Sequence, residues 1–297
     1  MVVIMFFAFF LPLTAGLVYS MAALTLKQAT TPSGIGLTRV LFISNLMFVV
    51  VFSPLLLIDH EVLDWSRWPG LLEAGVAVFL GSIFRIMAIR AMHVSFLTPL
   101  MGSKALFAAI LSVILIGMPI PFSWWLGAAI TTVAVFILGF SSGFKGHLAI
   151  KGVFYALLCS FLFASSEVTM AKEAHLFGKT PFIVFMVMIQ ATLSFLLIPF
   201  FKRPLTMLPK GSWKYTITGG ALLGVQAMLL FTGISQSGNA VLANIAYASR
   251  GFWSILLVWF LGHWWANDER AHGAKTMIRR TIGASLLFIA IVIVLVF

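Results

Sequence analysis

Three ionisable side chains lie deep inside long apolar stretches of the sequence. Lys104, Glu167 and Arg250 each stand about 10 to 18 residues from the start of such a stretch. At the rise of an α-helix this is at least ~15 Å along a membrane span, too deep for easy contact with the aqueous interface. Charged groups at membrane depth are costly and commonly mark a substrate or ion pathway. We therefore interpret these residues as the centre of a candidate binding site.

Two interpretations of this charged set stay open. In the first, Glu167 pairs with Lys104 or Arg250, and the ion pair locks the helices together. In the second, the charges face a cavity, where the cations bind a carboxylate or phosphate and Glu167 binds an amine. For Lys104 the preceding Pro99 and Gly102 favour the second interpretation, because they indicate an irregular backbone beside a cavity. For Arg250 both interpretations are equally supported.

Other polar residues at membrane depth complete the candidate site. The segment 239–250, NAVLANIAYASR, places small and hydrogen-bonding side chains on one helical stripe, which suits a binding wall or close helix packing. Arg85 lies one turn deeper than Arg90 and fits either a cavity or the membrane surface, whereas Arg39 and Arg90 can reach the headgroups. The remaining candidates, each with packing as the alternative, are Tyr247, Asn244, Ser249, Tyr19, Gln226 and Trp253, with Ser20, Ser165 and Ser166 beside them.

Glu167 is also a candidate proton carrier. Coupling to a proton gradient requires a group that changes charge during transport, and burial and a neighbouring cation act on a carboxyl group in opposite directions. Protons are therefore a candidate second partner beside the small-molecule substrate. The alternative is a permanent ion pair without a role in coupling.

The elements that position these residues are membrane-spanning helices. Hydrophobic residues make up 61% of the chain and charged residues only 9%, whereas soluble domains are about half apolar. Runs of about 20 apolar residues recur along the whole chain, which indicates helices rather than a β-barrel. The sequence predicts an all-α integral membrane protein, in contact with membrane lipids.

Several function classes are disfavoured. The net charge of +11 is explained by short basic loops beside spans and anionic headgroups, and no nucleic-acid module is visible. No metalloprotease, P-loop or nucleophile-elbow motif occurs, so we expect neither an enzyme nor a cofactor. We also expect no metal site, because Cys159 is the single cysteine and the histidines are widely spaced: His60, His93, His147, His175, His263 and His272. A surface metal site at His263, His272 and Asp268 is the alternative to their interpretation as solvated loop residues.

We predict ten transmembrane helices. No connection between them is long enough for a soluble domain. The approximate ranges are 2–26, 35–58, 70–90, 94–117, 119–142, 149–171, 180–201, 213–235, 239–262 and 277–297.

The sequence repeats itself at an offset of 145 residues, which rises to 156 after Gly117. Five spans in each half is an odd number, so the second half crosses the membrane in the opposite sense. We predict two five-helix inverted-topology repeats, 1–148 and 149–297, around a central cavity. Matched pairs include Ser20 and Ser165, Lys27 and Lys172, Asn45 and Gln190, Gly75 and Gly220, and Phe107 and Phe252.

Three local features accompany the two five-helix halves. They are Arg39 early in the second span, the small-residue start of the fourth (LTPLMGSKALFAAILS) and the Gly-Ala pairs that begin the fifth and tenth (WLGAAI, TIGASL). Over essentially its whole length the chain resembles the drug/metabolite transporter (DMT) superfamily, in its ten-helix EamA branch. The resemblance implies a basket of helices around a central cavity that exports or exchanges small metabolites such as amino acids. The chain departs from the family after Gly117 and Gly262, where an acidic residue is usual.

Basic residues are concentrated on one side of the predicted spans. Connections after odd-numbered spans hold twelve Lys and Arg residues, and those after even-numbered spans hold three. The positive-inside rule then places both termini outside, opposite to the usual orientation of the family. We expect a multi-pass protein of the cell's inner membrane, as a monomer or weak homodimer.

The function predicted from these features is secondary transport by alternating access. The expected substrate is a small polar or amphipathic metabolite, amino-acid-like. Phosphorylated or nucleotide-sugar-like anions and lipid-linked head groups are the alternative substrates, which the excess of cations over Glu167 suits. A non-transporting membrane scaffold or sensor is the alternative from another class.

Overall fold

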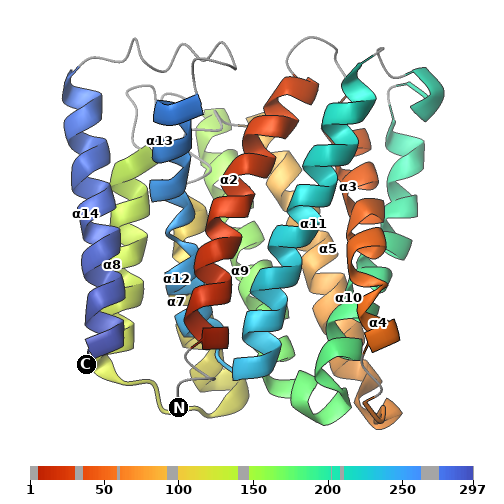
Figure 1. Cartoon of the computed structure of the whole chain (residues 1–297), viewed down its shortest axis with the longest axis horizontal. Coiled ribbons are helices and arrows are strands. Elements are labelled where there is room, and N and C mark those ends of the chain that lie inside the picture. The colour runs from red at the N-terminus through yellow and green to blue at the C-terminus, as the bar shows by residue number, and fades with distance from the viewer. Residues whose placement is uncertain are drawn as a thin grey trace.

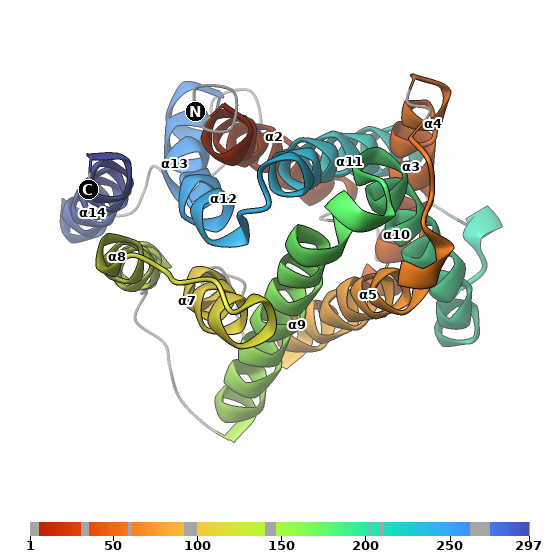
Figure 2. The same cartoon turned by 90° about the horizontal axis from the view of Figure 1, so that it is seen from below.

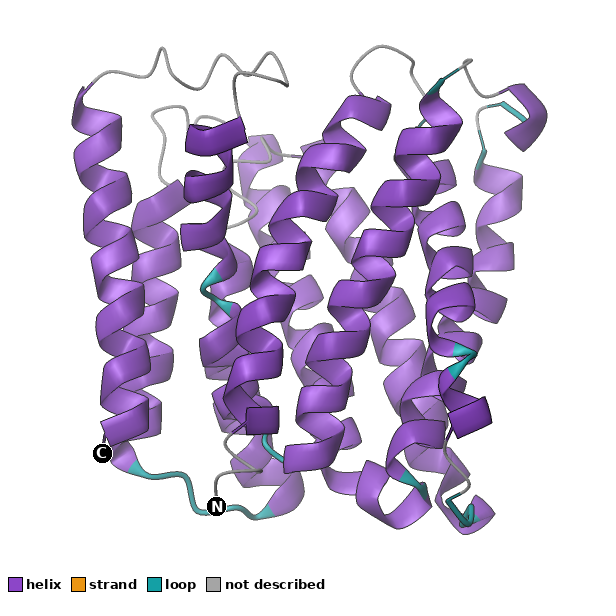
Figure 3. Cartoon of the chain, viewed as in Figure 1, coloured by secondary structure: helices purple, strands orange, loops and turns teal. Residues whose placement is uncertain are grey.

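The structure is a computed structural model, and it describes residues 6–30, 36–58, 61–91, 100–139, 147–201, 203–207, 211–261 and 274–296. Throughout these residues the secondary structure is helical, with short turns and loops and no strand (Figures 1 and 3). Long apolar sequences form helices because each helix satisfies its own backbone hydrogen bonds, which the lipid interior cannot do.

The first half of the chain folds into short and long helices. The elements are η1 (Phe6–Phe10), α2 (Leu11–Thr30), α3 (Leu37–Phe52), α4 (Leu55–Ile58), η2 (Trp65–Arg67), α5 (Trp68–Ala91), η3 (Met101–Ser103), α7 (Lys104–Leu111), η4 (Ser112–Ile116) and α8 (Phe122–Gly139).

The second half follows the same order of long helices. The elements are α9 (His147–Phe177), α10 (Lys179–Ser194), η5 (Phe195–Phe200), η6 (Leu205–Met207), α11 (Ser212–Ser237), α12 (Ala240–Tyr247), α13 (Arg250–Leu261) and α14 (Ala274–Val296).

Six helical segments are long and apolar enough to cross a membrane. The prediction of an all-α membrane protein is therefore confirmed at this level, while the number of ten spans stays a prediction. Shorter apolar helices cover Met101–Ile116, Phe122–Val135 and Ser285–Val294. The six segments are Phe7–Leu26, Leu37–Leu57, Trp65–Ala91, Ile150–Phe177, Lys179–Phe200 and Ser212–Ser237.

The predicted fourth and ninth spans are not continuous α-helices. Around Lys104, a 3-10 turn (η3) precedes α7 and a π-type turn (η4) follows it. This segment ends at Gly117, whose φ of 69° is readily adopted only by glycine. The ninth span is interrupted between α12 and α13, at Ala248 and Ser249. The helix backbone is thus irregular beside two of the three predicted central charges, and Pro99 lies outside the described residues.

The helices are arranged in two rows, which Figure 2 shows along the helix axes. One row holds α8, α7, α9 and α5, and the other holds α12, α2 and α11. Helices α3 and α10 pack together at one end, and α8 and α14 at the other. The described chain begins at Phe6 and ends at Val296 at the same edge of the molecule (Figure 1).

Helix contacts recur in pairs that match the 145-residue offset. Helix α2 packs on α11 as α9 packs on α5, and α13 packs on α2 as α7 packs on α9. A Cβ atom added to Gly75 would meet Ile189, and one added to Gly220 would meet the Cα of Ser44. Residues 75 and 220 correspond at the 145-residue offset, and so do residues 44 and 189, so the two contacts are equivalent. The largest apolar core lies along α9, α10 and α11, and it includes Phe177, Phe182 and Met186.

Candidate functional site

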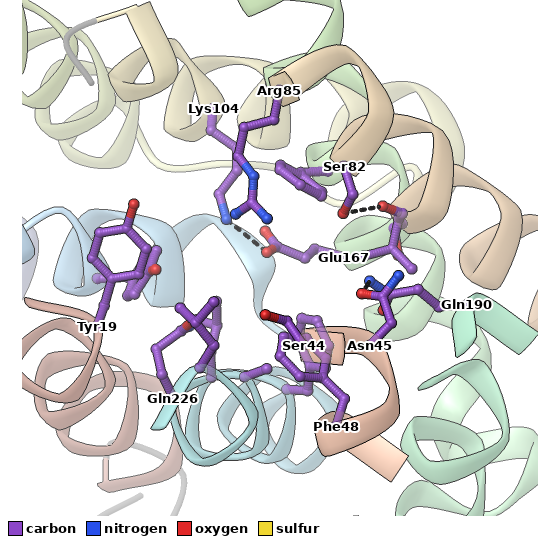
Figure 4. A pocket seen from close by; sticks show the side chains of 18 of the residues that line it. Tyr19, Ser44, Asn45, Phe48, Ser82, Arg85, Lys104, Glu167, Gln190 and Gln226 are labelled. Atoms are coloured by element: carbon purple, nitrogen blue, oxygen red, sulfur yellow. Dashed lines mark hydrogen bonds and ion pairs between the residues drawn. The ribbon is translucent and has the colours of Figure 1, made fainter. Parts of the chain in front are cut away.

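A cavity lies between the two rows of helices. It contains about 700 Å³ of space between atoms, part of it open to solvent. Side chains from α2, α3, α5, α7, α9, α10, α11, α12 and α13 line the cavity, so residues from both halves of the sequence meet there. Its walls combine charged, amide and aromatic groups (Figure 4).

A buried ion pair forms one wall of this cavity. The Nζ atom of Lys104 donates a hydrogen bond of 2.6 Å to Oε1 of Glu167. The second carboxylate oxygen, Oε2, accepts a hydrogen bond of 2.7 Å from the Asn244 amide. The side chains of Lys104 and Glu167 are only 8% and 4% exposed. Both oxygens of Glu167 therefore already accept a hydrogen bond within the protein, and its charge is paired with that of Lys104.

Arg250 stands on the cavity between two tyrosines. Its guanidinium carbon lies 4.7 Å from the ring centroid of Tyr247 and 5.2 Å from that of Tyr19. The centroids of the two rings lie 6.0 Å apart in an edge-to-face contact. Each ring attracts the guanidinium through a cation–π interaction. Within the described part of the chain, no carboxylate forms an ion pair with Arg250. The positive charge of this buried arginine is left for another partner.

The cavity is positively charged overall. Arg85 also lines it, with its guanidinium carbon 6.0 Å from the ring centroid of Phe163. Figure 4 shows the Arg85 side chain beside Lys104 and Glu167. Among the described residues that line the cavity there are three cations and one carboxylate. Such a set attracts an anionic group.

Close helix packing positions Arg250. The hydroxyl of Ser20 donates to the backbone carbonyl of Arg250 at 3.0 Å. Gly16 lies one turn before Ser20 on α2, and a Cβ atom added to it would lie 3.0 Å from the backbone nitrogen of Arg250 and 3.0 Å from Oγ of Ser249. Helix α2 thus approaches the break between α12 and α13 because residue 16 has no side chain.

Most of the predicted site residues meet at the cavity. Asn244 contacts Glu167 and borders a smaller adjoining cavity. Ser249 and Trp253 do not line the main cavity; both are directed into the surrounding protein, and each leaves a buried polar atom without a partner. Seven of the predicted residues line the main cavity: Lys104, Glu167, Arg250, Tyr247, Arg85, Tyr19 and Gln226.

Ser165 and Ser166, which were predicted beside the site, point in different directions, and Arg39 is buried. Ser166 lines the cavity, whereas Ser165 points away and donates to Glu73 at 2.9 Å. The expected contact of Arg39 with headgroups is wrong. This side chain is 2% exposed, and its Nη1 donates to the carbonyl of Pro204 at 3.2 Å, because the chain after η5 folds over it.

The sequence analysis missed a polar wall opposite the ion pair. Asn45 and Gln190 both line the cavity, and the Gln190 amide donates to Oδ1 of Asn45 at 3.0 Å. Their correspondence at the 145-residue offset was the available signal, since matched residues of a two-fold repeat meet where the axis passes. Aromatic lining residues such as Phe48 and Phe163 carried no signal, because they resemble the other phenylalanines of the chain.

Metal ligands do not gather in the described ranges. No group of three His, Cys, Asp or Glu side chains is close enough there to hold an ion. His263 and His272 lie outside the described residues.

Comparison with known proteins extends to the fold alone. No protein-family model matches the chain, and no curated protein matches it. A solved structure named only "Crystal structure of protein" is similar, with a TM-score of 0.79 and 17% sequence identity. The match covers 97% of this chain and 98% of the other. Almost the whole chain therefore shares its fold with a solved protein.

Proposed function

We propose that the protein is a secondary transporter for a small polar or amphipathic metabolite that carries a carboxylate, amino-acid-like in character. The observation that carries this proposal is Arg250, a buried cation on the cavity with no acidic partner in the described chain. Lys104 is neutralised by Glu167, so Arg250 is the cation available to a substrate carboxylate. A guanidinium has five N–H donors in a planar fork, so it can bind a planar anion while it lies against two tyrosine rings.

The proposal includes alternating access by two inverted five-helix halves, with ten spans in all. Support comes from the reciprocal packing of α2 on α11 and α9 on α5, and from the direct contact of the matched residues Asn45 and Gln190. In Figure 1, α8 begins at the edge where α14 ends, so these two packed helices run antiparallel. An antiparallel pair of corresponding helices is what an inverted repeat requires. The proposed family is the DMT superfamily, in its EamA branch.

The proposed location is the cell's inner membrane, with both termini outside. Helix ends at the edge opposite the termini carry Lys27, Arg90 and Lys151, in keeping with the positive-inside rule. Reporter fusions to Phe297 test the orientation, and a cytoplasmic reporter signal overturns it.

A second substrate class is favoured by Arg85. Two cavity cations without an ion-pair partner in the described chain, Arg85 and Arg250, suit a phosphate or another dianion as well as a carboxylate. The proposal therefore has two arms for its test, carboxylates and organophosphates.

Ligand-induced stabilisation of the purified protein tests the proposal. A ligand of the native state at 100 times its Kd adds about 2.7 kcal/mol of stability. We expect carboxylates of the right shape to stabilise the protein, their carboxamide analogues to fail, and Arg250→Gln to lose the response. Arg90→Gln is the matched control, because Arg90 is exposed at the end of α5 and does not line the cavity. Equal stabilisation of wild type and Arg250→Gln by the same acid contradicts the proposal.

A further inference from the structure

The wall of the cavity opposite the ion pair is polar but uncharged. It is formed by Gln226 of α11, Ser44 and Asn45 of α3, and Gln190 of α10. In Figure 4 Lys104 and Arg85 lie on one side of Glu167, and Ser44, Asn45 and Gln226 lie on the other. We call these four residues the amide wall.

Gln226 has unused hydrogen-bonding groups at the cavity. The residue is 7% exposed and lines the cavity, and its side chain makes no hydrogen bond within the described part of the chain. A primary amide offers two donors and one acceptor oxygen. Neither polar atom of this amide is among the fully buried atoms without a partner, so the amide keeps accessible surface at the cavity. Gln226 therefore presents two donors and one acceptor to a ligand in the cavity.

The three other residues of the wall also have hydrogen-bonding groups to spare. Asn45 and Gln190 share one hydrogen bond, which leaves Nδ2 of Asn45 and Oε1 of Gln190 without a partner. Exchange of the oxygen and nitrogen positions in both amides would still leave one donor and one acceptor over. The hydroxyl of Ser44 has no partner either. These three atoms have almost no accessible surface, whereas the amide of Gln226 is not among the buried atoms, so Gln226 is the residue of the wall that a ligand in the cavity meets first.

The chemistry of this wall selects among possible ligand groups. A charged group would find no opposite charge among these four side chains, and an aliphatic group would leave their amides unsatisfied. A primary carboxamide satisfies them best, because it donates and accepts at the same time and pairs with another amide through two hydrogen bonds. Sites built to hydrogen-bond a polar group discriminate strongly against analogues that lack the group.

We propose that the amide wall is a second binding subsite, which takes a carboxamide of the substrate while Arg250 takes its carboxylate. This inference rests on the proposed function and narrows its substrate class to small carboxylic acids that carry a neutral amide at the far end. Aliphatic acids of the same shape are then poor ligands.

Two isosteric pairs of amino acids test the subsite. L-asparagine has the shape of L-leucine, and L-glutamine that of L-homoleucine, so each pair differs only in the amide. Dissociation constants are measured from ligand-induced thermal stabilisation of the full chain in detergent. We expect wild type to bind at least one amide about tenfold more tightly than its isostere, the value of one net hydrogen bond.

Matched variants assign this preference to Gln226. Gln226→Met keeps the length of the side chain, and we expect it to reduce the ratio to near one. Gln236→Met is the control, since Gln236 lies on the same helix, accepts a hydrogen bond from Lys179 and does not line the cavity.

The outcomes separate the two proposals. Equal binding of an amide and its isostere by wild type, with both responses lost in Arg250→Gln, overturns the subsite and leaves the proposed function standing. An amide preference that survives in Gln226→Met also overturns the subsite. Failure of all four acids to bind counts against the amino-acid arm of the proposed function, and the subsite falls with it. The wild-type ratio decides even if Gln226→Met does not fold.

Discussion

The ion pair between Lys104 and Glu167 allows a quantitative prediction about stability. The Nζ atom of Lys104 and the Oε1 atom of Glu167 lie 2.6 Å apart, and both side chains are more than nine-tenths buried. Lys104→Met leaves a buried carboxylate with only the Asn244 amide as a donor. Glu167→Gln keeps an oxygen that can accept from Lys104 but removes the negative charge, so the buried ammonium is left without a counter-ion beside the face of Tyr247, at 5.1 Å. Removal of one partner of such a pair costs about 3–5 kcal/mol.

The double variant should recover most of this loss. Lys104→Met together with Glu167→Gln leaves no uncompensated charge, and replacement of a buried pair by neutral groups is often close to neutral for stability. We therefore expect each single variant to be destabilised by about 3–5 kcal/mol, and the pair to show a coupling energy of about 3 kcal/mol or more. Denaturant unfolding in mixed micelles measures all four proteins.

A second double-mutant cycle, on an ion pair at the protein surface, provides the control. Arg67 and Glu173 lie 3.7 Å apart, but the Arg67 side chain is 44% exposed. Exposed ion pairs contribute about 1 kcal/mol or less, so Arg67→Met and Glu173→Gln should show weak coupling. The reasoning is refuted if Lys104→Met is as stable as wild type, or if the buried pair couples no more strongly than this exposed pair.

Three further predictions concern coupling, packing and pH. If Glu167 carries the coupling proton, the double variant above keeps substrate exchange but loses accumulation driven by a pH gradient; unchanged accumulation with unchanged pH dependence excludes this role. Gly16→Val should cost about 1–3 kcal/mol and weaken ligand binding, because its Cβ atom would press on the backbone of Arg250; normal stability and binding would show that α2 can move away. Hydrogen bonds from the Ser66 side chain and backbone hold the pKa of Asp64 below its ordinary value of 3.8. Asp64 thus stabilises the fold above that pH, and the stabilisation is lost as the pH falls through the lower, folded-state pKa. Unfolding curves of wild type and Asp64→Ala should therefore converge in acid, and a constant gap between them would contradict this.

Much of the fold could be predicted because composition and span length dominate in a membrane. The apolar runs indicated helices, and the depth of Lys104, Glu167 and Arg250 indicated a shared site before any contact was known. These three side chains do line one cavity. Intramembrane charge is informative because burial without a partner is costly.

The remaining features depend on packing between distant segments. Whether Glu167 pairs with Lys104 or Arg250 is decided by how α7, α9 and α13 meet, which no local pattern encodes. The break between α12 and α13 falls at Ala248 and Ser249, and neither of these residues is a proline or glycine that would predict a break. Ser249 lies within this break and Trp253 in the helix after it, and neither of them lines the main cavity.

Substrate flux through proteoliposomes tests the central proposal most directly. Vesicles with purified wild-type protein are loaded with an unlabelled amino acid, and uptake of the labelled form is followed against empty vesicles and the Arg250→Gln and Arg90→Gln proteins. The account predicts saturable exchange by wild type and Arg90→Gln, and none by Arg250→Gln. If folded wild-type protein produces no flux for any carboxylate or organophosphate that it binds, the account is contradicted, and the chain is a membrane scaffold or sensor rather than a transporter.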